Sequence, residues 1–169
     1  MAVQTRGPTA DGDVLVDIRA QPGALRAVAG FLLERHFTPD PSPDGIVHRF
    51  RLASSEADAV IDVLVPDNVG VRADLTTDPP GRTLQVPAGT QALRRTELVN
   101  VLAEGRLGTV PRPNLVGAVL VKVAALSLPG DARRHETDIA FLLACMPNPL
   151  EAGKELTSRE VAPQQLRPE

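Results

Sequence analysis

Two stretches decide the fold, TADGDVLVDI at residues 9–18 and AVIDVLV at residues 59–65, because each carries aspartate within a run of Val, Ile and Leu. A carboxylate is costly to bury alone, so each acid needs a cation, a hydrogen-bond donor or a solvent-facing position. Asp11 and Asp13 stand two residues apart and therefore project from the same face of a strand. If the second strand lies beside the first, Asp62 completes a group of three carboxylates on that face.

Carboxylates grouped in this way indicate a divalent metal site. Their hard oxygen atoms suit Mg²⁺, which carries phosphate substrates, so the three acids are candidates to orient a nucleoside triphosphate and activate an attacking hydroxyl. The alternative is that Asp11-Gly12-Asp13 forms a turn before the strand, with Asp62 on a solvated face of the sheet. The spacing alone leaves both interpretations open, because an Asp-x-Asp pair is a weak motif.

The composition is that of an ordinary globular chain with few aromatic residues. Its 169 residues are enough for one domain with a real core and an accessory helical lobe. With no Trp or Tyr and only four Phe, the core must be built from Val, Leu and Ala. The formal net charge of −3 gives no global attraction to nucleic acid or to an anionic membrane.

The sequence predicts a cytoplasmic protein without a membrane partner. The N-terminus has no apolar leader segment, and no apolar run approaches the ~18 residues of a membrane span. Cys145, the single cysteine, lies in the apolar run FLLACM and is expected to be buried as a small hydrophobe. One cysteine and three scattered histidines provide neither a disulfide framework nor a zinc ligand set.

The first half of the chain predicts a sheet with a helix on one face. Strands are indicated by apolar runs and by alternation, the helix by an amphipathic pattern, and loops by Pro, Gly and Asp. This order of elements is typical of an α/β or α+β architecture. The expected elements are a strand over 13–19, a helix over 24–35, a loop over 37–45, strands over 46–52 and 59–65, a long loop over 66–81 and a short strand over 82–86.

The C-terminal third predicts a small helical lobe, after residues 90–104, which fit either a helix or a strand. Pro111-Arg112-Pro113 is expected to break the chain, and Asn114 is the expected N-cap of the next helix. The predicted helices cover residues 115–126, 134–146 and 150–159.

Lys122 stands near the middle of an otherwise apolar predicted helix, in a chain with only two lysines. An ammonium group there must snorkel, pair with a carboxylate or meet the anion of a ligand. Contact with triphosphate oxygens and an ion pair within the lobe both remain open. Asp138, on the next helix, is a partner within reach, and Arg134 lies one helical turn before it.

Taken together, these residues resemble the nucleotidyltransferase family that includes AbiEii/AbiGii-type toxins. In that family an Arg-x-Thr-x-Asp-x-Asp segment enters the first catalytic strand, and a later strand brings another acid. Here Thr9, Asp11 and Asp13 fit the segment, with Arg6 three residues before Thr9. Asp62 stands where the third acid falls.

The resemblance extends into the predicted helical lobe and covers roughly residues 6–146. The run VLVKVAA around Lys122 looks like the apolar helix of the family that bears one Lys. Arg134 and Asp138 look like the Arg…Asp motif that follows it.

The family implies an α+β fold, with a nucleotidyltransferase-like mixed β-sheet, flanking helices and a small C-terminal helical lobe. It divides the chain into a core at residues 1–110, a helical lobe packed on the core at 111–160 and a disordered tail at 161–169.

The implied chemistry is metal-dependent transfer of a nucleotide from NTP to a hydroxyl on RNA or protein. By this comparison Asp11, Asp13 and Asp62 are catalytic and bind Mg²⁺ or Mn²⁺, and Asp62 also helps to deprotonate the acceptor hydroxyl. Lys122 would grip the triphosphate. The residues implied to bind the nucleotide are Thr9, Lys122, Arg134 and Asp138.

The chain departs from the family pattern in two respects. The Gly-Ser or Gly-Gly helix start that cradles phosphates before the paired acids is not found ahead of Asp11, which indicates a protein that is truncated at the N-terminus, degenerate or dependent on a partner. Gly12 replaces the apolar residue usual between the two acids, which weakens the strand. The alternatives are a non-catalytic binding or regulatory module of the same fold, such as a toxin–antitoxin component with an antitoxin partner, and an unrelated small α/β protein whose acids are solvated.

Overall fold

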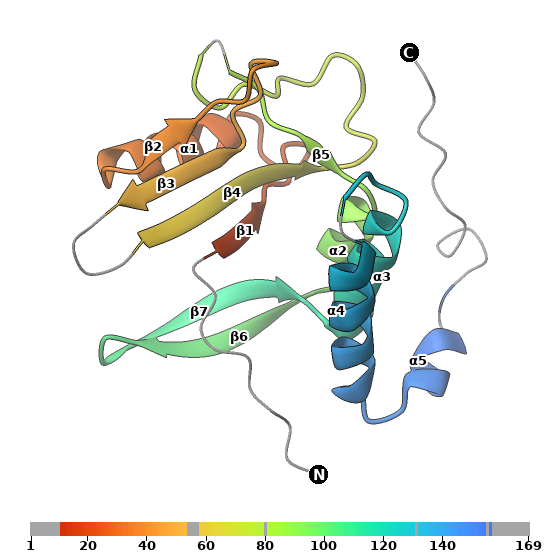
Figure 1. The fold of residues 1–169 in the computed structure, drawn as a ribbon. Coiled ribbons are helices and arrows are strands. Elements are labelled where there is room, and N and C mark those ends of the chain that lie inside the picture. The colour runs from red at the N-terminus through yellow and green to blue at the C-terminus, as the bar shows by residue number, and fades with distance from the viewer. Residues whose placement is uncertain (1–10, 54–57, 80, 131, 155, 157–169) are drawn as a thin grey trace. The chain divides into compact units, whose positions relative to one another are not determined.

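The computed structural model describes residues 11–53, 58–79, 81–130, 132–154 and 156 (Figure 1). The chain forms two compact units, Met1–Gln85 and Val86–Glu169, which we describe separately. None of the helices in the described ranges has the length and apolar character needed to cross a membrane.

The first unit is built on a mixed five-stranded sheet. Its strands are β1 (Asp11–Leu15), β2 (Thr38–Asp40), β3 (Arg49–Ala53), β4 (Asp58–Pro66) and β5 (Gln85–Val86). The order is β1-β4-β3-β2, and β5 also pairs with β4 (Figure 1). β1 runs parallel to β4, whereas β3 is antiparallel to both β4 and β2. β4 is therefore the strand on which the sheet is assembled.

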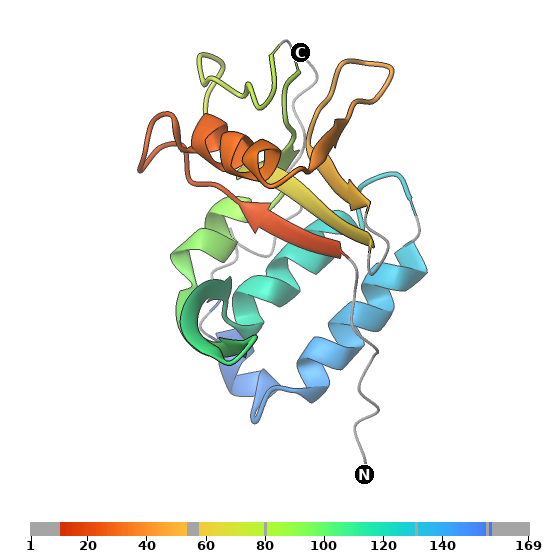
Figure 2. The same cartoon turned by 90° about the vertical axis from the view of Figure 1, so that its left-hand side faces the viewer.

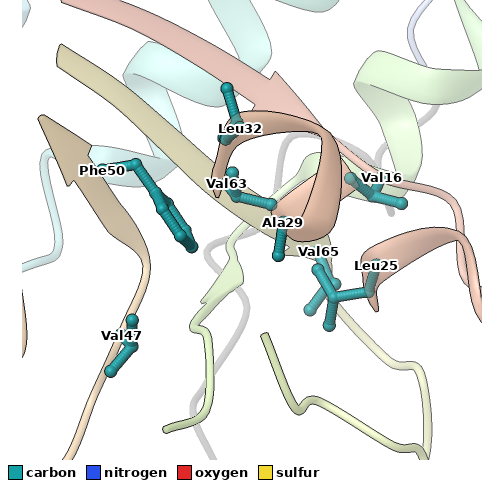
Figure 3. Packing of buried hydrophobic residues seen from close by; sticks show 8 residues of the cluster. All are labelled: Val16, Leu25, Ala29, Leu32, Val47, Phe50, Val63 and Val65. Atoms are coloured by element: carbon teal, nitrogen blue, oxygen red, sulfur yellow. The ribbon is translucent and has the colours of Figure 1, made fainter. Parts of the chain in front are cut away.

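The helix α1 (Ala24–Glu34) covers one face of this sheet (Figure 2). Leu25, Ala29 and Leu32 follow the spacing i, i+4, i+7, so they lie on one side of the helix, and all three are buried. They pack against apolar side chains of the sheet and its connections (Figure 3). The core residues drawn in Figure 3 are Val16, Leu25, Ala29, Leu32, Val47, Phe50, Val63 and Val65.

The second unit contains one β-hairpin and, among its described residues, four helices. Its elements are α2 (Gly89–Arg94), β6 (Thr96–Ala103), β7 (Arg106–Pro113), α3 (Leu115–Ala125), α4 (Ala132–Ala144) and α5 (Pro149–Lys154). Ala103 pairs with Arg106, so Glu104 and Gly105 alone form the turn of the hairpin. Both have positive φ, 50° and 73°, as a tight turn that matches the twist of the strands requires.

α3 packs closely at Gly117. A Cβ atom there would lie 3.2 Å from the Cβ of Arg95 and 3.3 Å from that of Pro113, which is tighter than usual, so a larger side chain would require these neighbours to shift. Asn114 begins α3, and its side chain accepts a hydrogen bond from the N–H of Gly117 at 2.9 Å. This cap satisfies one of the donors left open at the start of a helix.

The predicted α+β class is confirmed by the mixed sheet and the flanking helices. The helices predicted over 24–35 and 115–126 are present as α1 and α3, and Asn114 is the N-cap of α3 as expected. The helix predicted over 134–146 corresponds to α4. Residues 90–104, which the sequence left open, divide into α2 and β6. The domain boundaries expected from the family resemblance remain predictions.

Two strands were not expected. β2 lies within the predicted loop 37–45, and β7 runs through Pro111-Arg112-Pro113, where a break was predicted. Among the described strands, β7 pairs with β6 alone, so in that part of the chain one of its edges carries no ladder of hydrogen bonds. Residues two apart point their backbone nitrogens to the same side of a strand, so both prolines fit with their nitrogens on the open edge.

The prediction of a buried Cys145 is wrong, because the residue is exposed. α4 ends at Ala144, and Cys145 lies in the turn that follows. The apolar run that indicated a buried thiol therefore extends beyond the helix.

We expect Phe50→Ala to lower the free energy of unfolding by about 3–5 kcal/mol, because Phe50 is 0% exposed and its loss leaves a cavity under α1. Phe31→Ala is the matched control, since Phe31 is 52% exposed and its loss should cost about 1 kcal/mol or less. Urea denaturation followed by far-UV circular dichroism measures both, because the chain has no Trp or Tyr for fluorescence. Equal losses in the two variants would contradict the placement of Phe50 in the core.

Candidate functional site

Charged side chains form one row across the sheet of the first unit, with one residue from each of four neighbouring strands. Asp13 of β1 stands opposite Asp62 of β4. Asp62 in turn stands opposite Arg49 of β3, and Arg49 stands opposite Asp40 of β2. We call Asp40, Arg49, Asp62 and Asp13 the charged row.

The charged row lies on the face of the sheet that points away from α1. Phe50 and Val63 alternate with Arg49 and Asp62 along β3 and β4, and both are 0% exposed within the core. Successive side chains of a strand point to opposite faces, so Arg49 and Asp62 face the other way. This alternation explains how β4 carries an acid inside an apolar run.

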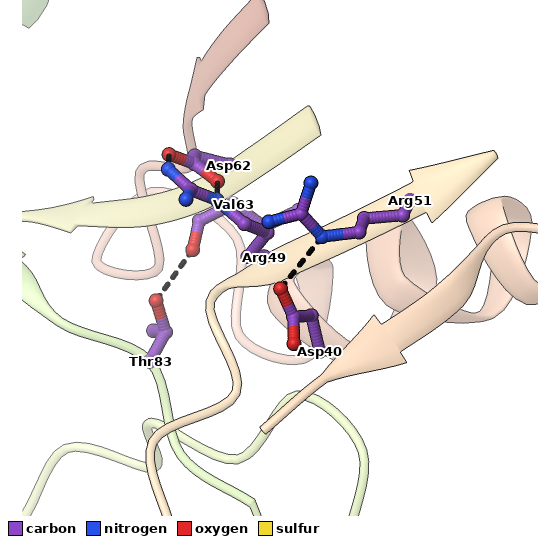
Figure 4. Close-up of polar contacts among 6 residues, drawn as sticks. All are labelled: Asp40, Arg49, Arg51, Asp62, Val63 and Thr83. Atoms are coloured by element: carbon purple, nitrogen blue, oxygen red, sulfur yellow. Dashed lines mark hydrogen bonds and ion pairs between the residues drawn. The ribbon is translucent and has the colours of Figure 1, made fainter. Parts of the chain in front are cut away.

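Arg49 binds Asp62 through two parallel hydrogen bonds (Figure 4). Its Nε donates to Oδ1 of Asp62 at 2.8 Å, and its Nη2 donates to Oδ2 at 2.7 Å. The side chain of Asp62 is only 16% exposed, whereas that of Arg49 is 38% exposed. Such a fork is among the strongest pairings that a carboxylate makes in a protein.

The neighbouring row of the same face adds a second ion pair. Asp11 stands opposite Val60, and Val60 stands opposite Arg51. Arg51 reaches across to Asp40, where its Nε donates to Oδ2 at 2.7 Å (Figure 4). The two rows together carry more acid than base, with the carboxylates Asp11, Asp13, Asp40 and Asp62 and the guanidinium groups of Arg49 and Arg51.

The acids on this face stabilise the charged form of Arg49. The hydrogen bond to Asp62 raises the pKa of Arg49 further above its ordinary value, and the charges of Asp62, Asp11 and Asp40 act in the same direction. Partial burial opposes this effect but is the weaker influence. We call this face of the sheet, with Asp11, Asp13, Asp40 and Asp62, the acidic face. Arg49 is a permanent cation within it.

β4 also forms hydrogen bonds with Thr83 and Leu84, the residues just before β5. The hydroxyl of Thr83, which is buried, donates to the carbonyl oxygen of Val63 (Figure 4). The N–H of Val65 donates to the carbonyl of Leu84 at 3.1 Å. These contacts fix the strand that holds Asp62, so the position of its carboxylate is determined by the backbone as well as by Arg49.

Asp11 and Asp13 are the residues of this face whose position and chemistry fit a divalent cation. Both are exposed and project from the same side of β1, and their oxygen atoms are hard ligands. Within the described ranges, no three His, Cys, Asp or Glu side chains are grouped so as to hold a metal ion by themselves. A cation here would therefore combine the two carboxylates with oxygen atoms of a bound phosphate, which is how Mg²⁺ is commonly held.

In the second unit, Lys122 and Asp138 form an ion pair between α3 and α4. The Nζ atom of Lys122 lies 3.1 Å from Oδ2 of Asp138, and their side chains are 33% and 14% exposed. The ion pair that the sequence offered as one explanation of Lys122 is thus present. Arg134 is exposed, one turn before Asp138 on α4.

Of the remaining candidates, Thr9 lies outside the described residues. Arg49 was not singled out from the sequence, although the alternation over 46–52 places it and Arg51 on one face of the strand. An arginine on the polar face of a strand is a signal for a partner acid, and Asp62 is the only aspartate within the predicted strand 59–65. Pairing those two observations would have identified the fork.

Comparison with family models, with curated proteins and with solved structures finds no match to this chain.

We expect Arg49→Gln to lower the free energy of unfolding by about 1–3 kcal/mol, because it removes both donors from a largely buried carboxylate opposite Asp13. Arg51→Gln is the matched control, and should cost at most about 1 kcal/mol, since the Arg51 and Asp40 side chains are 50% and 42% exposed. Urea denaturation at constant pH and salt measures the difference.

The double variant Arg49→Gln with Asp62→Asn tests the cause of that loss. It should regain part of the stability, because the carboxylate left without its donors is then absent. Equal losses in Arg49→Gln and Arg51→Gln, or no recovery in the double variant, would contradict the importance of the fork.

Proposed function

We propose that this chain is a metal-dependent, nucleotidyltransferase-like protein that acts in the cytoplasm. It would transfer a nucleotide from NTP to a hydroxyl on RNA or protein, with Mg²⁺ or Mn²⁺ as the cation. One observation carries the proposal: Asp11, Asp13 and Asp62 share one face of the sheet, and Asp13 stands directly opposite Asp62. The family resemblance of the same residues supports it.

In this proposal Asp11 and Asp13 hold the cation. The bound cation would neutralise the charge of the triphosphate and of the group being transferred. The two carboxylates come from one strand whose register with β4 is fixed over five residue pairs, so their spacing does not depend on a loop. Positioning of this kind is the main contribution that a protein makes to phosphoryl transfer.

Asp62 would orient the acceptor hydroxyl. A carboxylate has about four lone-pair directions, and the two hydrogen bonds from Arg49 use one on each oxygen. Asp62 therefore keeps capacity to accept a hydrogen bond from a hydroxyl placed beside Asp13. Arg49 acts on the reaction only by fixing the direction of that carboxylate, and is a positioning residue.

Nucleotide binding by Thr9, Lys122, Arg134 and Asp138 is the second part of the proposal. Lys122 would contact triphosphate oxygens while Asp138 holds its ammonium group at 3.1 Å. An ammonium group has three donors, so the ion pair with Asp138 leaves donors for a phosphate. Arg134 is exposed and presents a guanidinium group at the start of α4, the helix that carries Asp138.

The fork between Arg49 and Asp62 also favours a second candidate, a non-catalytic binding or regulatory module of the same fold. Arg49 already neutralises the most buried acid of the charged row, so this face is stable without a cation. Such a module could serve as a toxin–antitoxin component and bind an antitoxin partner. It would not transfer nucleotides.

We expect NTP with Mg²⁺ to raise the melting temperature of the full chain, by the equivalent of about 2.7 kcal/mol when the ligand is at 100 times its Kd. Asp13→Asn should abolish this shift, because it removes one of the two carboxylates proposed to hold the cation. Asp44→Asn is the matched control, since it removes an exposed acid of the first unit that lies outside the charged row. Thermal melts with each of the four NTPs measure the effect.

Incubation with labelled NTPs and total RNA or protein then separates the two candidates. Label transferred by the unmodified chain and by Asp44→Asn, but not by Asp13→Asn, supports the transferase. A thermal shift without transfer favours the binding module. Transfer that survives Asp13→Asn, or the absence of any shift at millimolar NTP, would contradict the proposed site.

A further inference from the structure

A cavity of about 550 Å³ opens in the first unit, at the start of α1. Its walls are the segment that follows β1, from Ile18 to Arg26, and the loop that follows β4, from Val69 to Thr76. Figure 2 shows both segments beside the first turn of α1. The proposed function makes no use of this cavity.

The cavity lies where the carboxyl ends of two parallel strands meet. β1 and β4 are adjacent and parallel, so the segments that leave them emerge at the same edge of the sheet. In open sheets, crevices at the carboxyl ends of parallel strands are the usual place for a ligand, because loops diverge there. The charged row involves Asp13, which is the middle residue of β1 and does not line the cavity.

Positive charge dominates the walls of the cavity. Arg19, Arg26 and Arg72 line it, and Asp74 is the single acid among the lining residues. The first turn of α1 contains no acidic residue, and Gly23 at its N-cap offers no side-chain acceptor. The start of the helix therefore supplies no carboxylate that would neutralise the arginines. The positive walls of the cavity contrast with the formal net charge of the chain, which is −3.

Two of the three guanidinium groups pair with an acid. Arg26 donates to Asp74 through Nη2 at 2.9 Å, and Arg19 donates to Asp17 through Nε at 3.2 Å. A guanidinium group has five N–H donors, so the pairing with Asp74 leaves Arg26 further donors for a ligand. In the described part of the chain, no ion pair joins Arg72 to an acid, and its side chain is exposed on the loop.

One exposed ion pair joins the two walls. The bond from Arg26 to Asp74 joins α1 to the loop after β4, 48 residues further along the chain. Asp74 also accepts from the N–H of Thr76 at 3.0 Å, and the hydrogen bonds from Thr76 and then Arg26 lower the pKa of Asp74. Asp74 is therefore charged at neutral pH, where it can pair with Arg26.

The remaining lining residues are largely apolar and include Ile18, Leu25 and Val69. The volume is within the range of about 300–1,000 Å³ typical of small-molecule sites. Arg19 and Arg26 are already paired with Asp17 and Asp74, so the three arginines leave an excess of one positive charge, which favours an anionic ligand. The oxygen atoms of a phosphate monoester can accept hydrogen bonds from more than one guanidinium group at once. Guanidinium groups also fit the oxygen geometry of phosphate.

We propose that this cavity binds a small phosphate monoester, with Arg19, Arg26 and Arg72 around the phosphate and the apolar wall against the rest of the molecule. The site is independent of the acidic face and of any metal ion. It gives the first unit a second ligand, beyond the NTP of the proposed function.

Calorimetric titration of the full chain in EDTA, at fixed salt, tests this site with phenyl phosphate and inorganic phosphate as probes. Phenyl phosphate should bind saturably, and more tightly than inorganic phosphate, because only the ester reaches the apolar wall. Arg72→Gln should weaken it about tenfold, equivalent to about 1.4 kcal/mol. Arg19→Gln should also weaken it, and far-UV circular dichroism checks that both variants fold.

Arg82→Gln is the matched control, since it removes an exposed arginine of the same unit that does not line the cavity, and its affinity should be unchanged. Asp13→Asn should also bind phenyl phosphate normally, even if the nucleotidyltransferase proposal fails. Loss of binding in Arg82→Gln or Asp13→Asn, or no saturable binding, would overturn the proposal. So would an RNA oligonucleotide that displaces phenyl phosphate at lower concentration, because the site would then recognise a phosphodiester chain.

Discussion

The ion pair between Arg49 and Asp62 is the interaction on which the sheet of the first unit depends. β4 is the strand that β1, β3 and β5 all contact, and Asp62 stands in its middle between Ile61 and Val63. A carboxylate that is only 16% exposed needs a partner, and Arg49 supplies two donors from the position directly opposite. A slip of one residue between β3 and β4 would turn Arg49 toward the core and Phe50 toward solvent. The ion pair and the apolar core therefore select the same register.

Patterns of period two and 3.6 were sufficient to predict most elements of the first unit, and α3 and α4 of the second. They predicted that Asp11 and Asp13 share a face, since that follows from the geometry of any strand. They did not determine which strand lies beside β1. The adjacency of Asp13 and Asp62 results from pairing between residues 49 positions apart in the chain, which local patterns do not encode. β2 has only three residues, which are too few to show alternation. In β7 the prolines argued against a strand, and the turn residues Glu104-Gly105 were the one sequence feature that could have indicated the hairpin.

Both proposed functions of the acidic face involve the same residue. Arg49 holds the carboxylate of Asp62 in a fixed direction, which suits an enzyme that must place an acceptor hydroxyl. The same guanidinium group makes the face stable without a bound cation, which suits a module that only binds. The proposed enzyme and the proposed binding module differ in their use of Asp11 and Asp13. The oxygen atoms of these two residues are exposed hard ligands, which the enzyme alone would use to hold a cation. Catalysis requires that these two carboxylates, and not the fork, meet the metal and the triphosphate.

The acidic face and the cavity would bind phosphate in opposite ways. Asp13 lies in the middle of β1, whereas Ile18 lies in the turn after the strand, so the two sites are formed by different residues. On the acidic face, a phosphate is repelled unless a cation lies between it and the carboxylates. In the cavity, the proposed phosphate would be bound by the arginines directly, without a divalent cation. A ligand of the cavity and a nucleotide on the acidic face would therefore differ in metal dependence, although β1 and β4, which pair over five residues, lead into both sites.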